Sequence, residues 1–404
     1  MVHGGAGLAR VPGGRVALVR GGIPGELVRT SLTEVKGVLQ GEVEEVIEAS
    51  PDRVEPPEHP GLDYGHIRYS RQQELKAAVV EDALRRAPGK PEIQFHPLQP
   101  SPLEWAYRNT VQPAVRSRRL GYRVPGSDEV QTLERDPVAF AGINRCWGEL
   151  LERGLPKGVR EVVLRANDGG DVLVALIATS PQRTLLPFAH QLVQAGIAVG
   201  VTYARFDPRG RFRGGHERLA GERHILQQYG EHLLSVSVSS FAQPNPAAAS
   251  LLYRELAAIA PRVDTAVELF AGSGGISFHL APRVARIEAV EIDRGSVARG
   301  EADAARLGID NVTFRAIDAR KYELPANVEL VAVDPPRAGL NKETRAQITE
   351  SGARHLVYVS CDPATWARDV AAFIQDGWRV GFARPYDFFP HTHHVELLSL
   401  LSRD

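Results

Sequence analysis

The sequence predicts an α/β protein in which a C-terminal doubly wound (Rossmann-like) domain with a mixed seven-stranded sheet follows a small β-barrel and a β-rich α+β domain. From about residue 250, apolar runs alternate with helical patterns, which is typical of βαβ units and a mostly parallel sheet. Residues 1–50 hold short alternating runs between glycine turns, as in a small barrel. We place the domains at residues 1–50, 51–240 and 241–404.

The composition is that of an ordinary globular protein. The chain has 404 residues, enough for two or three domains, with 43% apolar and 24% charged residues. No apolar run approaches the length of a membrane span, so we expect a cytoplasmic protein with no membrane partner, working as a monomer. Two widely spaced cysteines, Cys146 and Cys361, exclude a disulfide framework and an all-cysteine metal cluster.

Arginines are concentrated in two stretches although the net charge is only −1. Residues 105–127 contain five arginines, no acid and two tyrosines, and residues 205–218 are also rich in arginine and glycine. Arginines interleaved with aromatic rings suit phosphate contacts and base stacking in RNA. A solvated arginine-rich face explains the same pattern equally well, so composition leaves both interpretations open.

The elements of the first two domains follow from local patterns. Alternating residues predict strands within 15–19, 26–32 and 38–48, and a proline-rich linker follows. Leu75, Val79 and Leu84 recur at helical spacing and predict a helix over 69–86, which we expect to pack on the C-terminal domain. Between 105 and 240 the pattern is mostly β. Strands are expected near 161–165 and 171–177 around an Asn-Asp-Gly-Gly turn, with a helix over 187–195.

Seven strands are predicted in the C-terminal domain, at 265–270, 287–292, 312–316, 328–333, 355–360, 380–383 and 395–401. Helical patterns separate most of them. The connection over 384–394 is too short for a crossover helix, so the seventh strand should run antiparallel and begin where the sixth ends. Because ligands bind beyond the carboxyl ends of parallel strands, the residues at those ends are the candidates for a site.

A glycine-rich loop follows the first of these strands. Gly272, Gly274 and Gly275 let the backbone turn sharply and approach a ligand closely. About twenty residues later the second strand ends in Glu291, placed to accept from two ribose hydroxyls. Asp318 closes the third strand and could accept from an adenine amino group.

The charge of this loop favours one class of cofactor. An NAD enzyme would show a Gly-x-Gly-x-x-Gly fingerprint and hold a pyrophosphate at a helix N-terminus. Here the loop is Gly-Ser-Gly-Gly with an acid, Glu268, at its entry. A cationic nucleoside without phosphate, such as S-adenosylmethionine, fits better than NAD.

Two strand ends carry groups that could react. Cys361 ends the fifth strand where a helix begins, and helix N-terminal amides favour the reactive thiolate, although a lone cysteine is more often a small core residue. Glu396 is the second residue of the seventh strand and should lie near the thiol, unless it is an edge-strand surface residue. The order of the strands should place six residues at the carboxyl edge of the sheet: Glu268, Gly272, Glu291, Asp318, Asp334 and Cys361. Three histidines at 391, 393 and 394 lack a further ligand cluster, so we expect no metal.

Five ordered motifs together resemble the RNA (uracil-5-)-methyltransferase family. They are Phe241-Ala-Gln-Pro-Asn-Pro, Glu268-Leu-Phe-Ala-Gly-Ser-Gly-Gly, Asp334-Pro-Pro-Arg, Ser360-Cys-Asp-Pro-Ala-Thr and Phe389-Pro-His-Thr-His-His-Val-Glu. The resemblance covers nearly the whole chain. His3-Gly-Gly-Ala-Gly-Leu-Ala-Arg through Ser50-Pro-Asp-Arg-Val resembles the TRAM domain, an RNA-binding barrel, and Tyr107-Arg-Asn and Leu120-Gly-Tyr-Arg resemble the central domain.

The resemblance implies a reaction and roles for these residues. Cys361 would add to C6 of uracil, and Glu396 would remove the C5 proton after methyl transfer from S-adenosylmethionine. Asp334 would either hold the cofactor or orient the uracil. The other cofactor-binding residues would be Gln243, Phe270, Gly272, Gly275, Glu291 and Asp318.

The family resemblance also narrows the substrate and cofactors. A TRAM-like segment suggests the 23S rRNA branch, with a tRNA uracil-C5 enzyme as the alternative. A cytosine-5 RNA methyltransferase needs a second cysteine that is absent here, and a non-catalytic RNA-binding protein remains open. Many relatives hold an iron–sulfur cluster on four cysteines. Here Gly61-Leu-Asp-Tyr-Gly-His-Ile-Arg stands where three of them would be, and the fourth is replaced near Asp136, so we expect no cluster.

Overall fold

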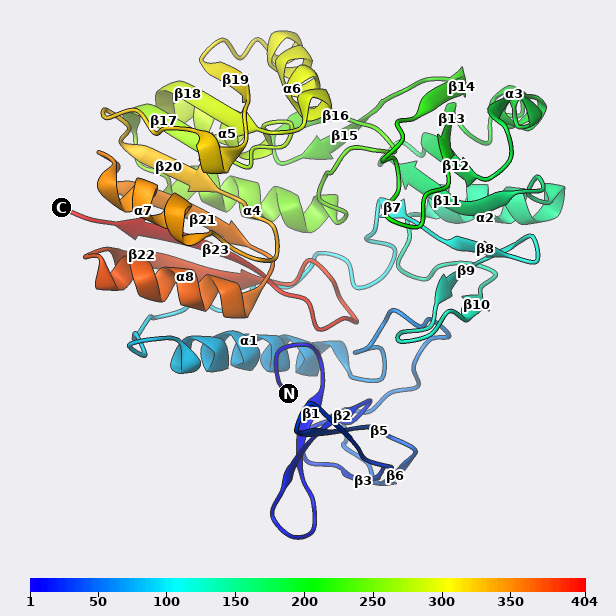
Figure 1. Cartoon of the computed structure of the whole chain (residues 1–404), viewed down its shortest axis with the longest axis horizontal. Helices are drawn as coiled ribbons and strands as arrows, with labels where there is room; N and C mark the ends of the chain where they lie inside the picture. Colours follow the sequence, from blue (N-terminus) through cyan, green and yellow to red (C-terminus); the bar gives the residue numbers. More distant parts are fainter.

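The computed structural model describes residues 1–404, and its C-terminal part is an α/β domain around a seven-stranded sheet (Figure 1). The strands are β17 (Val263–Leu269), β18 (Val284–Glu291), β19 (Val312–Ala316), β20 (Leu330–Val333), β21 (His355–Ser360), β22 (Arg379–Tyr386) and β23 (Glu396–Ser402). Their order is β19-β18-β17-β20-β21-β23-β22. Only β23 runs antiparallel to its neighbours, as the short connection before it predicted.

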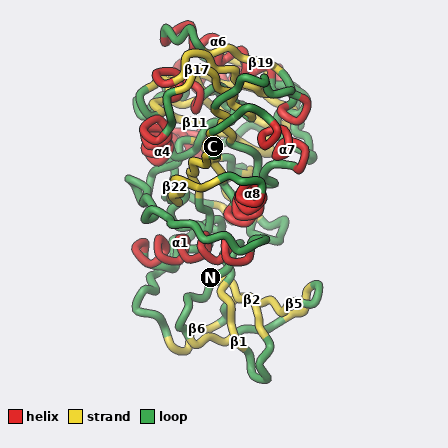
Figure 2. Tube along the Cα trace, turned by 90° about the vertical axis from the view of Figure 1, so that its left-hand side faces the viewer, coloured by secondary structure: helices red, strands yellow, loops and turns green.

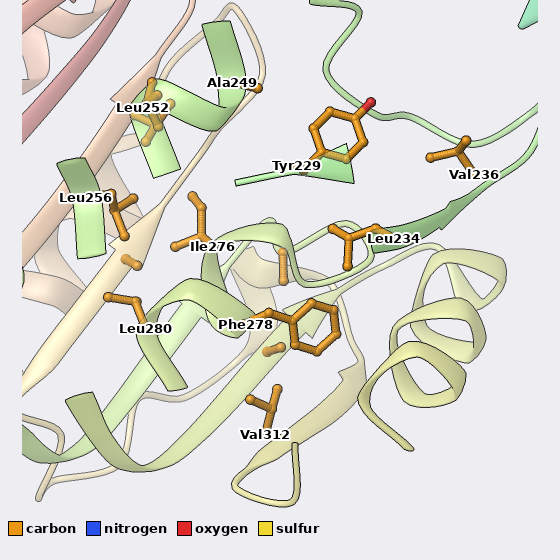
Figure 3. Close-up of a cluster of buried hydrophobic side chains, with 14 of the residues drawn as sticks. Tyr229, Leu234, Val236, Ala249, Leu252, Leu256, Ile276, Phe278, Leu280 and Val312 are labelled. Carbon is orange, nitrogen blue, oxygen red and sulfur yellow. The ribbon is translucent and has the colours of Figure 1, made fainter. Parts of the chain in front are cut away.

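Helices cover both faces of this sheet. They are α4 (Pro246–Ile259), α5 (Gly275–Leu280), α6 (Arg294–Leu307), α7 (Lys342–Glu350), α8 (Pro363–Gln375) and, from far upstream, α1 (Tyr69–Arg86). Successive strand residues point to opposite faces. Ala266 therefore belongs to the apolar cluster under α4, α5 and α6, whereas Val267 belongs to the cluster under α1, α7 and α8. Figure 3 shows the first cluster, where Leu252 and Leu256 of α4 lie near Ile276 of α5.

Side-chain caps start several helices at the carboxyl edge of the sheet. Asn245, Asp293 and Asp362 accept hydrogen bonds from the backbone amides of Ala248, Ser296 and Thr365 at the starts of α4, α6 and α8. Each cap satisfies an amide that has no partner within its helix, which is worth about 1 kcal/mol. The caps fix where these helices begin and therefore where the strand ends present their last side chains.

The predicted helix over 69–86 forms as α1 and lies along α8. A fully buried ion pair ties it to the C-terminal segment, because Lys76 Nζ lies 2.6 Å from Asp387 Oδ1 and also donates to the Phe389 carbonyl. Removing one partner of such a pair leaves an uncompensated buried charge, which typically costs 3–5 kcal/mol. The segment before β23 is thus anchored from outside the sheet.

The central region is built on an eight-stranded sheet. Its strands are β7 (Thr110–Val111), β8 (Ala114–Arg116), β9 (Arg119–Arg123), β10 (Val130–Thr132), β11 (Val159–Ala166), β12 (Val172–Ala178), β13 (Gly200–Arg205) and β14 (Glu217–Gly221). Helix α3 (Leu186–Gln194) forms near its predicted place. Helix α2 (Ala141–Arg153) was not predicted, although Ile143, Trp147 and Leu150 are fully buried at helical spacing. Cys146 shares that buried face and lies in the core.

The first fifty residues form two small sheets that project beyond α1 (Figure 2). One contains β1 (Gly7–Arg10), β2 (Val16–Arg20), β5 (Val38–Glu42) and β4 (Thr33–Val35), and the other pairs β3 (Leu27–Arg29) with β6 (Glu45–Glu48).

A hairpin of β15 (Ile225–Tyr229) and β16 (His232–Val236) lies against α4 and α6 rather than extending the central sheet. Its apolar residues Tyr229, Leu234 and Val236 join the cluster in Figure 3. We therefore propose that the C-terminal domain begins near residue 225, ahead of the boundary expected at 241. None of the helices in the chain combines the length and the apolar character needed to cross a membrane.

Candidate active site

A cavity of about 850 Å³ opens at the carboxyl edge of the seven-stranded sheet. This volume is within the range of small-molecule sites. Eight predicted site residues line it together with the acid at the loop entry, Glu268: Gln243, Phe270, Gly272, Gly275, Glu291, Asp334, Cys361 and Glu396. The convergence expected from topology is present for Glu268, Gly272, Glu291, Asp334, Cys361 and Glu396, and the other three residues are those that the family resemblance implied.

Asp318 is the one predicted residue that the structure places outside this lining. Its carboxylate caps the short 3₁₀ turn Ala319–Lys321 and accepts hydrogen bonds from three donors of Arg320: the backbone amide, Nε and Nη2. These hydrogen bonds lower the pKa of Asp318 to about 2. The Asp318 carboxylate therefore faces Arg320 and not the cavity.

The register of two strands sets the position of the thiol relative to Glu396. The antiparallel ladder between β21 and β23 pairs His355 with Ser402 at one end and Ser360 with Leu397 at the other. The ladder ends there, and continuing its register by one residue places Cys361 opposite Glu396. Residues directly opposed in an antiparallel pair carry their side chains on the same face, with Cβ atoms about 4.5–5.5 Å apart. The short connection before β23 thus brings a carboxylate to the thiol.

Glu396 is buried and one of its oxygens has no partner. Glu396 is 3% exposed, and its Oε2 atom is buried without a hydrogen bond. Burial and the neighbouring Asp334 raise the pKa of Glu396 well above its usual range, and the positive charge of Arg337 opposes that shift. An unpaired carboxyl oxygen aimed into a cavity is the arrangement expected of a group that accepts a proton from a bound substrate.

Two further buried carboxyl groups line the same wall. Burial raises the pKa of Asp334 to about 7 and that of Glu268 to about 8. Glu268 is partly satisfied, because Oε2 accepts from the backbone amide of Ser277 at 2.8 Å and from its hydroxyl. Three acids without a paired cation make a wall that favours a positively charged ligand.

The thiol of Cys361 is less acidic than the helix argument suggested. Burial, together with Glu396 and Asp334, raises its pKa to about 12. This shift is opposite to the one expected from the N-terminal amides of α8. Desolvation and nearby acids outweigh the helix dipole, whose effect is screened and short-ranged. The thiol must lose its proton after a ligand has changed the charge of the site.

The glycine loop is held open for a ligand by backbone geometry. Phe270, Gly272 and Gly274 all have positive φ angles, of 64°, 55° and 89°. Phe270 is in this conformation despite its side chain, a strain of the kind that collects at functional sites. Glu291 accepts from the amide of Gly272 at 3.0 Å and from that of Asp293 at 2.8 Å, which fixes its carboxylate at the mouth of the loop.

These features fit S-adenosylmethionine. The three acids match its sulfonium charge, and the unpaired Oε2 of Glu396 lies in the same cavity. The apolar wall of Phe270, Ala271 and Ile276 suits an adenine ring. A side chain at Gly275 would place its Cβ 2.9 Å from the Tyr253 hydroxyl, so this close approach requires glycine.

Gln243 is positioned from the central region. Its carbonyl accepts from the Tyr229 hydroxyl at 2.8 Å, and that hydroxyl accepts in turn from Asn109 Nδ2 at 3.1 Å. The loop that carries Gln243 is therefore fixed by the hairpin β15–β16 and by the start of the central sheet. Both regions must be folded for the cavity to take this shape.

Sequence reasoning missed several lining residues. Tyr253 of α4 and Arg337 line the cavity, and Arg337 Nη2 lies 3.4 Å from His394 Nε2. Arg337 is the last residue of the motif Asp334-Pro-Pro-Arg, but the sequence analysis predicted no role for it. The histidines before β23 have separate partners: His391 stacks on Trp105, His393 pairs with Asp63 at 2.5 Å, and His394 faces Arg337.

Comparisons with known proteins agree with this geometry. Residues 230–404 match the family model described as tRNA (Uracil-5-)-methyltransferase. The chain is 31% identical to the 23S rRNA (uracil(1939)-C(5))-methyltransferase RlmD of Chromohalobacter salexigens, over 100% of this chain and 88% of that protein. It is also 31% identical to an uncharacterized RNA methyltransferase of Streptomyces avermitilis, over 99% of this chain and 96% of that one.

Among solved structures, the chain is similar to the Pyrococcus abyssi tRNA (uracil-54, C5)-methyltransferase in complex with S-adenosyl-L-homocysteine. The TM-score is 0.78 at 22% identity, with 98% of this chain and 100% of that chain covered. The likeness therefore extends over the small N-terminal sheets, the central sheet and the seven-stranded sheet.

Proposed function

Because the chain belongs to the RNA (uracil-5-)-methyltransferase family, we propose that it methylates C5 of a uracil in 23S rRNA with S-adenosylmethionine as methyl donor. The observation that carries the proposed chemistry is the opposed pair Cys361 and Glu396 at the end of the β21–β23 ladder, inside an acid-lined cavity. A nucleophile and a base on adjacent strands suit a reaction that both adds to a ring and removes a proton from it.

The thiol makes C5 of uracil reactive. After losing its proton, Cys361 Sγ forms a bond to C6, and the C5–C6 double-bond electrons move onto C5 and the adjoining carbonyl. S-adenosylmethionine, when bound, would supply the electrophilic methyl group: the new C5–methyl bond would form as the methyl–sulfur bond breaks, and S-adenosylhomocysteine would leave. The positive charge of S-adenosylmethionine also lowers the pKa values of Cys361 and Glu396, because opposite charge favours the ionised forms.

Glu396 completes the reaction in this proposal. Once C5 carries the methyl group, the Glu396 carboxylate takes the C5 proton, the double bond re-forms, and the C6–Sγ bond breaks to release the thiolate. Asp334, one residue beyond β20, holds the cofactor or orients the uracil. Gln243, Phe270, Gly272, Gly275 and Glu291 would hold the cofactor.

The rRNA assignment rests on one of the relatives that match this chain along its whole length, a 23S rRNA (uracil(1939)-C(5))-methyltransferase. The alternative, a tRNA uracil, is favoured by the fold likeness to the archaeal tRNA enzyme. In either RNA the target base must leave its stack to reach a buried thiol. We further propose that the protein works in the cytoplasm as a monomer and carries no iron–sulfur cluster.

Transfer of tritiated methyl groups to purified RNA tests the proposal. Ribosomal and transfer RNA from cells lacking the gene serve as separate substrates, and 5-methyluridine is located by mass spectrometry of nuclease fragments. Label in 23S rRNA supports the proposed target. Label confined to tRNA selects the alternative, and label in neither fraction would leave only a non-catalytic RNA-binding role.

A further inference from the structure

A second, smaller cavity of about 80 Å³ lies where the central sheet meets α6 of the C-terminal domain. We call it the seam pocket. Its lining comes from β13, from β14 and the residue before it, from the residues that flank the hairpin β15–β16, and from α6: Thr202, His216, Arg218, Arg223, His224, Ser237, Val238 and Arg299. Five of these eight residues are basic, two carry hydroxyls, and none is an acid.

The three arginines of the seam pocket are poorly compensated. Only Arg299 has a carboxylate oxygen within 4.0 Å, and that contact, with Asp293 Oδ2, measures 3.9 Å. The Nε atom of Arg299 is buried without a hydrogen-bond partner. Arg218 donates only to the Gly221 carbonyl, at 3.1 Å. Guanidinium groups that converge without acids repel one another, so this arrangement favours an anion between them.

Neighbouring groups strengthen the positive field. Arg165 is 4% exposed, donates to the Ser240 carbonyl at 3.0 Å, and leaves Nε and Nη1 without partners. Burial and the nearby arginines lower the pKa values of His216 and His224, which can take up protons when an anion arrives. Besides Asp293, Asp303 of α6 also acts on Arg299, and its oxygens are already engaged by Ser235 and Arg306.

The seam pocket adjoins the large cavity. Arg299 Nη2 donates to Ser296 Oγ at 2.9 Å, and His216 Nε2 lies 3.3 Å from Ser239 Oγ. Ser296 and Ser239 both line the large cavity. One layer of side chains therefore separates the anion site from the space in which we place the cofactor and the uracil.

We propose that the seam pocket binds a backbone phosphate of the RNA strand whose uracil enters the large cavity. This inference rests on the proposed function. S-adenosylmethionine carries no phosphate, whereas a polynucleotide offers one per nucleotide. Arginine binds phosphate oxygens through two parallel hydrogen bonds, and the hydroxyls of Thr202 and Ser237 can donate to the same group. Arg218 and Arg223 are exposed, so a long strand can reach them.

The test is RNA binding by the full-length double variant Arg218→Ala/Arg223→Ala, followed by fluorescence anisotropy of a labelled oligouridylate at several salt concentrations. We expect affinity to fall about tenfold or more at low salt, and the slope of log affinity against log salt to decrease by about 1–2, because each phosphate contact releases counterions. The affinity for S-adenosylmethionine, measured by calorimetry, should not change.

Arg379→Ala is the matched control. Arg379 is a similarly exposed arginine at the opposite end of the sheet, where it pairs with Asp404. We expect Arg379→Ala to keep the wild-type RNA affinity and salt slope. The proposal is overturned if the double variant keeps them as well. It is also overturned if cofactor affinity falls while RNA affinity does not, since the pocket would then hold the cofactor carboxylate.

Binding and catalysis separate the two hypotheses. Salt-dependent oligouridylate binding that the double variant loses supports the seam pocket even if the wild-type protein methylates no RNA. Methyl transfer by a double variant with unchanged binding and unchanged KM for RNA would instead support the proposed function and refute the pocket.

Discussion

His3 Nε2 lies 3.1 Å from Asp362 Oδ2, which joins the first residues of the chain to the residue that follows Cys361. Asp362 also caps α8 by accepting from the Thr365 amide at 2.9 Å. Although burial opposes it, the hydrogen bonds from His3 and Thr365 lower the pKa of Asp362 to about 2, and Asp362 raises the pKa of His3. The residues that lead into β1 thus contact the turn that carries the candidate nucleophile.

We predict that His3→Ala loosens the first ten residues in a pH-dependent way. A histidine whose pKa is raised on folding stabilises fully below its unfolded value of about 6.5 and loses that contribution as pH rises through the folded value. The His3 side chain is 47% exposed, so the effect should stay below about 1 kcal/mol. Hydrogen exchange of this segment, corrected for intrinsic rates, should be faster in the variant at pH 6 and unchanged at pH 9. Equal loss at both values would contradict the prediction.

We predict that alkylation of Cys361 in the ligand-free protein is slow at neutral pH. With a pKa of about 12, the reactive thiolate should increase roughly tenfold for each pH unit up to pH 10, without a plateau. Iodoacetamide labelling followed by mass spectrometry measures this rate. Cys361→Ala is the control, because Cys146 is 1% exposed and should not react in the folded protein. A labelling rate that levels off between pH 7 and 8 would contradict the prediction, because it would show that Cys361 is already a thiolate at neutral pH.

We predict that Glu396→Gln traps a covalent protein–RNA complex. The amide keeps the shape of the side chain but cannot take the C5 proton, so the adduct at Cys361 should persist through denaturing electrophoresis. Turnover should fall at least about 100-fold, the usual cost of losing a general base. The double variant Cys361→Ala/Glu396→Gln should bind RNA without forming the complex. Normal turnover by Glu396→Gln would refute the role of Glu396.

We predict that Asp334→Asn stabilises the ligand-free protein at pH 8. The folded pKa of about 7 exceeds the unfolded value of about 3.9, so the folded state binds the proton more tightly, and stability falls as pH rises between these values. The variant removes this decline, and its melting midpoint should exceed that of the wild type by about 2 °C or more at pH 8. S-adenosylmethionine should raise the wild-type midpoint more than that of the variant.

Asp318→Asn provides the comparison for that measurement. Asp318 has its pKa lowered to about 2, so the wild-type carboxylate is ionised in both states at pH 8 and its loss should bring no stabilisation. A gain of similar size from Asp318→Asn would show that the effect of Asp334→Asn does not come from its buried charge.

We predict that pure protein contains no stoichiometric iron. Asp136, near the expected position of the fourth cluster cysteine, accepts from the Tyr122 hydroxyl at 2.5 Å and lies 3.7 Å from His59 Nε2. His59 precedes the stretch where the other three cysteines would be. This polar network joins the two segments that a cluster would join, and Asp136→Ala should cost about 1–3 kcal/mol by leaving buried donors unpaired. Iron analysis after anaerobic purification checks the absence of a cluster, and stoichiometric bound iron would refute that prediction. Thermal melting measures the loss of stability in Asp136→Ala.

The sheet and its site were largely predictable because topology controls them. Strand ends of a parallel sheet share one edge, so Glu291, Asp334 and Cys361 could be brought together from the order of elements alone. The antiparallel direction of β23 followed from a short connection. Asp318 also ends a strand, but its rotamer is set by Arg320 two residues later, a local contact that strand order does not reveal.

The ionisation of the site could not be predicted in the same way. Helix entry at Cys361 is visible in the sequence, whereas desolvation depends on atoms contributed from β23, β20 and the glycine loop. Helix α2 was missed because turn residues and strands surround it, although Ile143, Trp147 and Leu150 are spaced for a helix face. The boundary proposed near 225 differs from the expected one at 241 because β15 and β16 have the same sequence pattern as the strands before them.

Cys361 and Glu396 lie beyond the same end of the β21–β23 ladder, although helix α8 and strand β22 lie between them in the sequence. The ladder between β21 and β23 sets the register of the two strand ends that carry the thiol and the carboxylate, whereas the segment before β23 also lines the cavity through Phe389, Thr392 and His394. Insertions at the exposed turn around Gly377 could therefore accumulate in evolution without moving the reacting groups. The same turn is a rational place to open the chain for a circular permutant or to attach a reporter.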